Sequence, residues 1–386
     1  MSAALPTIHR FRVTRPRYQL EQVRIFDWLA AAHAEAEARL EGLSPEAQRA
    51  FETRVRRALG RCGCPPDKVA RRGFMLPDML STRWADNDFY DPSRQPRGPG
   101  SEARSRRYDA LASAYLEAEY ADELAAPRDL IHVTCTGYVA PSAAQRLVAA
   151  RGWGGLTRVT HAYHMGCYAS IPALRIAAGC LATATPSAPA GAGRVDVVHA
   201  ELCSLQFDPG AHGLDQLVVQ SLFADGLVRY SVELADGCPG LALLATHERL
   251  LPGTAGEMSW TVGDNGMLMT LSPEVPARVA GALRGFVTEL FALAGRDLAG
   301  IRHAVAAVHP GGPKIVDGVC RALELSEAQV GASREVLREC GNMSSATLPH
   351  VWASLLEGGS LRPGDLVLSL AFGPGLTVCG GLFEAR

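Results

Sequence analysis

The sequence predicts an α/β fold, because short apolar runs typical of buried strands alternate with longer segments of helical periodicity. The run LIHVTC at residues 130–135 is one such strand, with helical composition on both sides of it. A second observation is that the two parts of the chain have a similar outline, and each presents reactive residues at strand-to-helix turns. We therefore predict an internally duplicated chain, with one half at residues 1–235 and the other at 236–386, although no sequence repeat is strong enough to prove the duplication.

The N-terminal third is predicted to be largely helical. Apolar residues recur at helical spacing within residues 22–60, which predicts one or two helices, and residues 108–125 are again helical in composition. Residues 74–100 hold several Pro, Asp, Asn and Arg and are predicted to be an irregular surface excursion.

Strands and helices then alternate to the C-terminus. Pro141 and Ser142 suit the start of a helix, and Gly179 suits the end of the helix that begins at Cys167. Residues 183–193 are Ala, Pro, Gly and Ser, and are predicted to be a flexible connection. The other predicted strands are 157–163, 195–200, 227–234, 241–246, 305–308, 366–370 and 376–382, and the other predicted helices are 272–293, 333–339 and 345–356.

Composition excludes several classes of function. The chain has 386 residues, of which 47% are apolar and 20% are charged, so it is globular rather than disordered. A formal net charge of −2 gives no broad basic field for nucleic acid, and no apolar run is long enough to span a membrane. The N-terminus has no hydrophobic run typical of a secretory signal.

The ten cysteines are spread along the chain without a regular framework, so we predict reduced thiols in a cytoplasmic protein. Cys62 and Cys64 are the only close pair, and no further ligands cluster near them, so no metal site is predicted. The sequence has neither a dinucleotide-binding glycine fingerprint nor a P-loop, and no bound cofactor is expected.

Three short motifs carry the predicted chemistry. Cys167 lies in HMGCYA, His309 begins HPGGP, and Asn342 lies in GNMSS, each with glycine close by. Together they supply a thiol, an imidazole and an amide, a set that suits covalent capture of an acyl group followed by carbon–carbon bond formation. Cys167 is predicted at a helix N-terminus, which would lower the pKa of its thiol and offer an N–H to an oxyanion.

Each of the three residues also has a structural interpretation. Cys167 taken alone is as well explained by a buried structural thiol. A lone histidine such as His309 is more often structural, and Asn342 suits a helix N-cap. The functional interpretation explains all three residues at once, and we adopt it for that reason.

These motifs resemble those of the type III polyketide synthases, the chalcone synthase-like branch of the thiolase superfamily. The family has a nucleophile turn GC(F/Y)A followed by HPGGP, GNMSS and GFGPG. This chain has GCYA at 166–169, HPGGP at 309–313, GNMSS at 341–345 and FGPG at 372–375, in the same order. The segment LFADG at 222–226 also resembles the family.

The resemblance implies a thiolase-like, five-layered αβαβα fold and an acyltransferase activity. By the same resemblance Cys167 carries the acyl group. His309 and Asn342 bind malonyl-CoA, promote loss of carbon dioxide and stabilise the enolate that extends the acyl group. The product would be a small polyketide such as a pyrone or a resorcinol. CoA thioesters would be substrates, a homodimer is expected, and neither nucleic acid nor a membrane is an expected partner.

The resemblance also assigns residues to the substrate pocket. Phe223 matches an aromatic gatekeeper, and Met269 stands where plant members have a second one, so the cavity is expected to take a long or bulky acyl chain. The other residues assigned to substrate binding are Ser344, Phe372, Gly373 and Pro374.

Two groups of cations are candidates for CoA or carrier-protein contacts. The family's contacts to the CoA phosphates are assigned to Lys68, Arg71 and Arg72. The other group, Arg104, Arg106 and Arg107, is a candidate docking site for an acidic acyl-carrier protein. A solvated surface charge run explains these cations equally simply.

Two other functions remain open from the sequence. One is a carrier-protein-dependent enzyme similar to ketoacyl synthase III, performing a single condensation or an acyl transfer. The other is a non-catalytic subunit that shapes another ketosynthase, which is disfavoured because Cys167, His309 and Asn342 are all present.

Overall fold

The computed structural model describes residues 4–183, 193–234 and 238–386. The strands are β1 Pro6–Thr14, β2 Tyr18–Glu21, β3 Arg71–Phe74, β4 Asp129–Thr134, β5 Arg158–Tyr163, β6 Val195–Leu202, β7 Asp225–Leu234, β8 Leu241–Leu250, β9 Met258–Gly263, β10 Gly266–Leu271, β11 Val305–Val308, β12 Leu366–Gly373 and β13 Thr377–Ala385. The α-helices are α1 Gln22–Glu41, α2 Pro45–Cys62, α3 Ser101–Glu119, α4 Ala143–Ala150, α5 Ser170–Ala182, α6 Leu214–Gln220, α7 Val275–Leu293, α8 Pro313–Leu323, α9 Gly331–Cys340 and α10 Thr347–Glu357.

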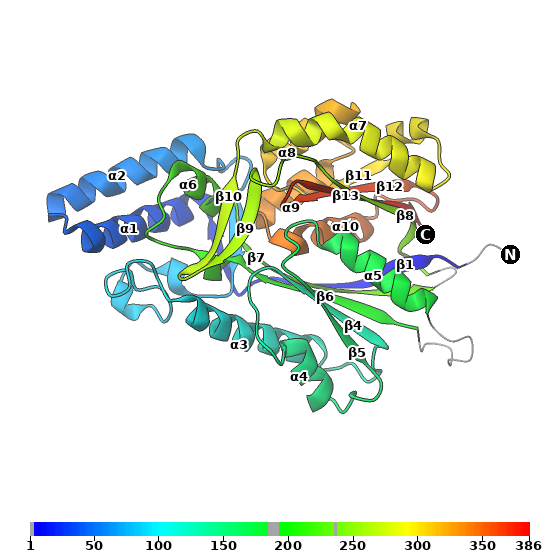
Figure 1. Ribbon diagram of the computed structural model, residues 1–386, viewed down its shortest axis with the longest axis horizontal. Helices are drawn as coiled ribbons and strands as arrows, with labels where there is room; N and C mark the ends of the chain where they lie inside the picture. The colour runs from blue at the N-terminus through cyan, green and yellow to red at the C-terminus, as the bar shows by residue number, and fades with distance from the viewer. Residues whose placement is uncertain (1–3, 184–192, 235–237) are drawn as a thin grey trace.

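The elements form five alternating layers of helices and strands (Figure 1). Helices α7 and α8 form one outer layer and α3 and α4 the other, while α5 and α10 lie between two groups of strands. Both α5 and α10 contact strands of each group. A helix in this middle layer must be apolar on two faces, and accordingly seven of the thirteen residues of α5 are buried.

The two groups of strands are joined into one sheet. Its order is β11-β12-β13-β8-β1-β7-β6-β4-β5, and the two groups meet where Thr7 and Ile8 of β1 pair with Ala242 and Leu241 of β8. Strand β4 pairs in parallel with β5 and β6, and β11 pairs in parallel with β12, while the other pairs are antiparallel. The predicted boundary between residues 235 and 236 lies outside the described residues, as does most of the predicted loop at 183–193.

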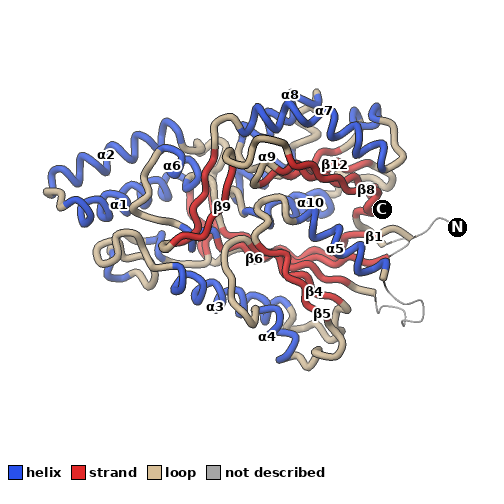
Figure 2. Tube along the Cα trace, viewed as in Figure 1, coloured by secondary structure: helices blue, strands red, loops and turns tan. Residues whose placement is uncertain are grey.

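Most predicted elements are present with ends shifted by a few residues, and the 305–308 strand matches β11 in full. The sequence did not predict β1, although β1 is central in the sheet, because its arginines break the apolar pattern of a buried strand. It also missed α6, α8 and the β9–β10 hairpin. Figure 2 shows this hairpin standing beside α6, apart from the large sheet.

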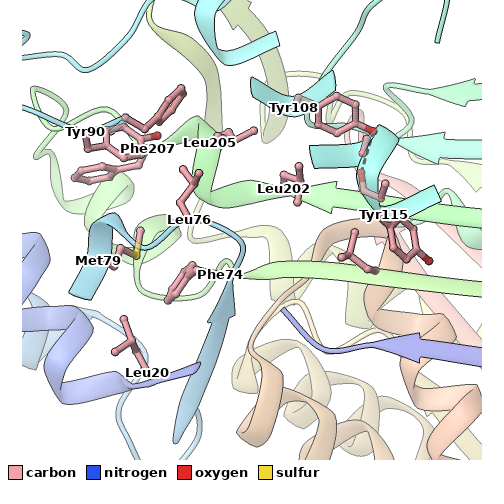
Figure 3. Packing of buried hydrophobic residues seen from close by; sticks show 14 of the residues in the cluster. Leu20, Phe74, Leu76, Met79, Tyr90, Tyr108, Tyr115, Leu202, Leu205 and Phe207 are labelled. Atoms are coloured by element: carbon pink, nitrogen blue, oxygen red, sulfur yellow. Dashed lines mark hydrogen bonds between the residues drawn. The ribbon is translucent and has the colours of Figure 1, made fainter. Parts of the chain in front are cut away.

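A separate apolar cluster fills the space beneath the N-terminal helices. Figure 3 shows Phe74 and Met79 facing α1 on one side, with Leu205 and Phe207 beyond them. Among the described residues, no helix is long and apolar enough to cross a membrane.

Burial in the middle layer is the main stabilising term that a single substitution can test. Leu174 on α5 is fully buried, so Leu174→Ala should lower the free energy of unfolding by about 2–5 kcal/mol. Leu124→Ala removes the same atoms from a side chain that is 93% exposed, and should change the free energy of unfolding by no more than about 0.5 kcal/mol. Urea unfolding measures both; equal effects of the two substitutions would contradict the assigned core.

Candidate active site

Cys167 lies in a tight turn between β5 and α5. Gly166 adopts φ +85°, and a Cβ there would lie 2.5 Å from Cδ of Pro374, so both the backbone angle and the space require glycine. The Gly166 N–H donates to Sγ of Cys135 at 3.0 Å, next to the end of β4. The turn is therefore held on one side by the C-terminal loop and on the other by β4.

The thiol of Cys167 is neutral in this environment. Burial raises the pKa of Cys167 to about 12, and the Glu201 carboxylate also raises it, while hydrogen bonds to Ser344 and Asn342 lower it. The thiol lies 3.9 Å from Oγ of Ser344. The prediction that a helix N-terminus lowers this pKa is wrong, because α5 begins three residues later and burial outweighs the remaining stabilisation.

His309 follows β11 and is only 2% exposed. Its backbone N–H donates to the carbonyl of Leu370 at 2.7 Å, which fixes it at the strand end. Within the described part of the chain, neither ring nitrogen has a hydrogen-bond partner. Burial lowers the pKa of His309 to about 3, so the ring is neutral and offers one donor and one acceptor to a ligand.

Asn342 connects the other two motifs. Its Nδ2 donates to the carbonyl of Gly311 in the HPGGP turn at 3.3 Å, and its side chain is near enough to Cys167 to lower the pKa of that thiol. Its Oδ1 accepts the Ser344 N–H at 2.9 Å, a local turn, and the helical turn that follows has Met343 rather than Asn342 as its N-cap. Segments far apart in the sequence therefore meet at one amide.

The main chain of Asn342 is fixed as firmly as its side chain. Its N–H donates to the carbonyl of Leu222 at 2.9 Å, and its own carbonyl accepts the N–H of Ala224 at 2.8 Å. Gly341 before it has φ +73°, and a Cβ there would lie 2.9 Å from the Leu222 carbonyl oxygen. These contacts form an isolated β-bridge between Phe223 and Asn342, which places Phe223 beside the GNMSS motif.

A small cavity opens beside the thiol. Its lining includes five of the residues that the sequence assigned, namely Cys167, Phe223, Met269, Ser344 and Pro374. It also includes residues that the sequence did not assign, namely Cys135, Thr136, Gly166, Cys203, Met258 and Trp260. Trp260 and Met258 were missed because the β9–β10 hairpin was not predicted.

Glu201 is a buried carboxylate near the thiol that the sequence also missed. It accepts hydrogen bonds from the Cys135 N–H at 2.9 Å, from Oγ1 of Thr136 at 3.0 Å and from Oγ of Ser345. Burial raises its pKa, although those hydrogen bonds oppose the change. The predicted strand stopped at residue 200, one position short of it, whereas β6 continues to Leu202.

Two residues assigned to the pocket lie elsewhere. Phe372 is 4% exposed and packs in the core between β11–β13 and α7. Gly373 supports the ring of Tyr168, because a Cβ at that position would come 2.1 Å from Cδ1 of the ring. Neither residue lines the cavity beside the thiol, and their assignment to substrate binding stays a prediction.

The assigned CoA cations fall into two groups. Lys68 and Arg71 are about half exposed and pair with Asp67 at 3.3 Å and Glu339 at 3.1 Å. Arg72 is 2% exposed, which corrects its assignment to CoA phosphates, since its guanidinium is used inside the protein. It donates to Oε1 of Gln22 and to the carbonyls of Gln220 and Phe223.

The arginine run proposed for a carrier protein is also divided. Arg104 is 1% exposed and donates to the carbonyls of Pro99, Leu205 and Phe207, so it is a structural residue. Arg106 remains at the surface and pairs with Glu102. Among the described residues, no group of three or more His, Cys, Asp or Glu side chains is placed to hold a metal ion.

Comparisons with known proteins give a consistent family. Residues 242–385 match the C-terminal domain of chalcone and stilbene synthases. The 1,3,6,8-tetrahydroxynaphthalene synthase of Streptomyces coelicolor is 31% identical over 286 residues, which cover 72% of this chain and 74% of that enzyme. The enzyme of the same name from Streptomyces griseus is 29% identical over 286 residues, which again cover 72% of this chain and 74% of that enzyme.

Solved structures agree with these sequence matches. PKS-I from the brown alga Ectocarpus siliculosus superimposes with a TM-score of 0.83 over 100% of both chains, at 22% identity. The 1,3,6,8-tetrahydroxynaphthalene synthase of Streptomyces coelicolor superimposes with a TM-score of 0.78 over 98% of this chain and 99% of that one, at 24% identity. That protein is a bacterial type III polyketide synthase. At these identities the likeness shows the fold, and it is the fold that the sequence predicted.

The charge of Glu201 gives a testable effect on the thiol. A nearby negative charge disfavours a thiolate, so Glu201→Gln should lower the pKa of Cys167 and raise its thiolate fraction at neutral pH. Iodoacetamide should then alkylate Cys167 severalfold faster at pH 7, as followed by peptide mass spectrometry. Glu119→Gln changes a buried carboxylate on α3 and should leave the rate unchanged. An unaltered rate in a folded Glu201→Gln protein would exclude the electrostatic effect.

Proposed function

The chain belongs to the type III polyketide synthases and is a condensing acyltransferase; from this premise we propose that Cys167, His309 and Asn342 are its catalytic residues. The observation that supports the assignment best is the amide of Asn342, which donates a hydrogen bond to the carbonyl of Gly311 in the HPGGP turn and lies close enough to Cys167 to lower the pKa of its thiol. A second support is the buried ring of His309, whose two nitrogens lack partners among the described residues.

In the loading step, the neutral imidazole of His309 accepts the proton of the Cys167 thiol. The sulfur attacks the acyl thioester, a new carbon–sulfur bond forms, and CoA leaves with the proton. Burial raises the pKa of the Cys167 thiol and lowers the pKa of the His309 imidazole, so both groups are neutral before the acyl thioester binds. Transfer of the proton during the attack suits that starting state.

In the extension step, malonyl-CoA loses carbon dioxide and the resulting enolate oxygen is stabilised by N–H donors of His309 and Asn342. The enolate carbon attacks the acyl carbonyl, a carbon–carbon bond forms, and the bond to Cys167 breaks. An amide is suited to this role because it donates hydrogen bonds without ionising. Repetition of the cycle and ring closure would give a small pyrone, resorcinol or similar product.

We propose CoA thioesters, rather than acyl-carrier protein, as the donors, with no bound metal or further cofactor. A surface cleft of about 440 Å³ runs past Lys68 and the start of α8 at Pro313, and it offers space for a nucleotide near the HPGGP turn. The burial of Arg104 removes one cation from the run that would have docked a carrier protein.

We also propose a cytoplasmic homodimer. All ten cysteines are free thiols, which agrees with a reducing compartment. Strand β5 is an edge strand of the large sheet, with one side available to pair with another chain.

Removal of the nucleophile tests the loading step. Cys167→Ala should lower condensation of acyl-CoA with malonyl-CoA by at least about 10³-fold, because the acyl group loses the thiol proposed to carry it. Release of carbon dioxide and free CoA measures the reaction, and Cys62→Ala, at an exposed thiol, is the control. Condensation by Cys167→Ala at the wild-type rate would refute the mechanism.

Removal of the amide tests the extension step separately. Asn342→Ala should still form the acyl enzyme on Cys167 but should decarboxylate malonyl-CoA about 10²–10³-fold more slowly, the usual cost of losing an oxyanion donor. Asn87→Ala removes an amide that donates only to the Tyr90 carbonyl and should retain full activity. Unchanged decarboxylation in a folded Asn342→Ala protein would remove Asn342 from the mechanism.

A further inference from the structure

Arg72 carries a positive charge inside the protein with no carboxylate to balance it. Its side chain is buried, and among the described residues no carboxylate lies within ion-pair distance of the guanidinium. Burial lowers the pKa of Arg72 to about 9, so the group remains protonated at neutral pH. Buried charges in proteins are normally paired, because burying an uncompensated charge is strongly unfavourable. Arg72 is an exception that calls for an explanation.

One nitrogen of this guanidinium also makes no hydrogen bond. Nε donates to Oε1 of Gln22 at 2.8 Å, and Nη1 donates to the carbonyls of Gln220 and Phe223 at 2.8 and 2.6 Å. The stem of the side chain packs on Gly341, where an added Cβ would lie 2.9 Å from Cγ of Arg72. Nη2 is buried and has no partner among the described residues. The side chain is therefore held in place with one donor still available.

Arg72 lines an internal cavity of about 50 Å³. Its guanidinium carbon lies 5.7 Å from the ring centroid of Phe74, and this ring also lines the cavity, so the charged end of Arg72 borders the space. A single water needs roughly 10–15 Å³ of such space, so the cavity has room for a group the size of a carboxylate.

The other polar side chains around this internal cavity are already engaged. Asp208, the one carboxylate in its described lining, pairs with Arg97 at 2.7 Å. Ser204 donates to Oδ2 of Asp225 at 2.8 Å. Of the described residues that line the cavity, only Arg72 has a buried polar side-chain atom without a partner. The available donor is therefore cationic, which favours an anion over a neutral ligand.

The internal cavity adjoins the cavity beside Cys167. The residues that line both are Cys203, Phe223, Trp260 and Met269. None of these four carries a carboxylate or an ammonium group, so they do not compete with Arg72 for an anion. An anion bound at Arg72 can therefore belong to the acyl group that Cys167 carries.

We propose that Arg72 and the internal cavity bind a carboxylate at the far end of the acyl group on Cys167. The preferred starters are then ω-carboxyacyl thioesters, which derive from dicarboxylic acids, rather than methyl-terminated acyl thioesters. A carboxylate oxygen accepts the hydrogen bond from Nη2, and the negative charge balances the guanidinium. This inference rests on the proposed function of Cys167 and adds to it the chemical class of the starter.

The test compares starters of the same shape that differ in charge. Glutaryl-CoA ends in a carboxylate, and 5-methylhexanoyl-CoA has two methyl groups in place of the two carboxylate oxygens. Succinyl- and adipyl-CoA, each with its own methyl counterpart, cover the neighbouring lengths. Each starter is assayed with malonyl-CoA, and products are identified by mass spectrometry. In the wild type, kcat/KM for the best ω-carboxyacyl starter should exceed that for its methyl counterpart by at least about tenfold, as expected of a charge-assisted hydrogen bond.

Two variants assign this preference to the guanidinium. Arg72→Gln removes the charge and should lower the carboxyl-to-methyl ratio of kcat/KM by at least about tenfold, whereas a purely structural role would lower both starters equally. Arg104→Gln is the matched control, because Arg104 is also buried but all three of its guanidinium nitrogens have partners. Arg104 is not among the described residues that line either cavity, so this variant should keep the wild-type ratio.

Equal use of the paired starters by the wild type would overturn the proposal, and this comparison decides alone if Arg72→Gln does not fold, as judged by circular dichroism. A wild-type ratio in folded Arg72→Gln would overturn it as well. Thermal stabilisation of the protein by free glutarate, without any preference between the paired starters, would assign the anion to a free acid and count against the proposal. If the wild type condenses none of the starters with malonyl-CoA, the proposed function of Cys167 is refuted instead.

Discussion

The hydrogen bonds of Asn342 are the constraint on which the arrangement of the site depends. The main chain of this residue is hydrogen-bonded on both sides to the segment around Phe223, and its side chain donates a hydrogen bond to the HPGGP turn close to Cys167. Because the bonds engage both the peptide and the amide, Asn342 has little freedom to move without disturbing at least two other segments. Three regions of sequence are thereby held at a common point before any substrate binds, which is the preorganisation that catalysis requires.

Burial of this point has a consequence for its chemistry. Desolvation keeps the thiol of Cys167 protonated and the imidazole of His309 neutral, and the nearby Glu201 reinforces the effect on the thiol. In the mechanism proposed above, proton transfer accompanies the arrival of a thioester, whose carbonyl meets hydrogen-bond donors that lack partners in the described structure.

The shape of the substrate space is set by parts of the chain that contribute no reacting group. The β9–β10 hairpin lies outside the large sheet, yet it supplies Trp260 and Met269 to the cavity beside Cys167. Trp260 is hydrogen-bonded to Cys135 and His164, which follow β4 and β5. The ends of these two strands therefore position both the turn of Cys167 and one wall of its cavity.

The sequence by itself determined the alternation of strands and helices, the family resemblance, and the three motifs around Cys167, His309 and Asn342, because these depend on local residue patterns. Only the tertiary structure decided that Arg72 and Arg104 are internal and that Phe372 belongs to the core. The sequence around an arginine does not show which backbone carbonyls will accept hydrogen bonds from its guanidinium in the folded protein. The raised pKa of Cys167 and the role of Trp260 as a wall were likewise not readable, because each is produced by contacts among segments far apart in the chain. Burial and long-range hydrogen bonding are properties of the folded whole, and no local pattern encodes them.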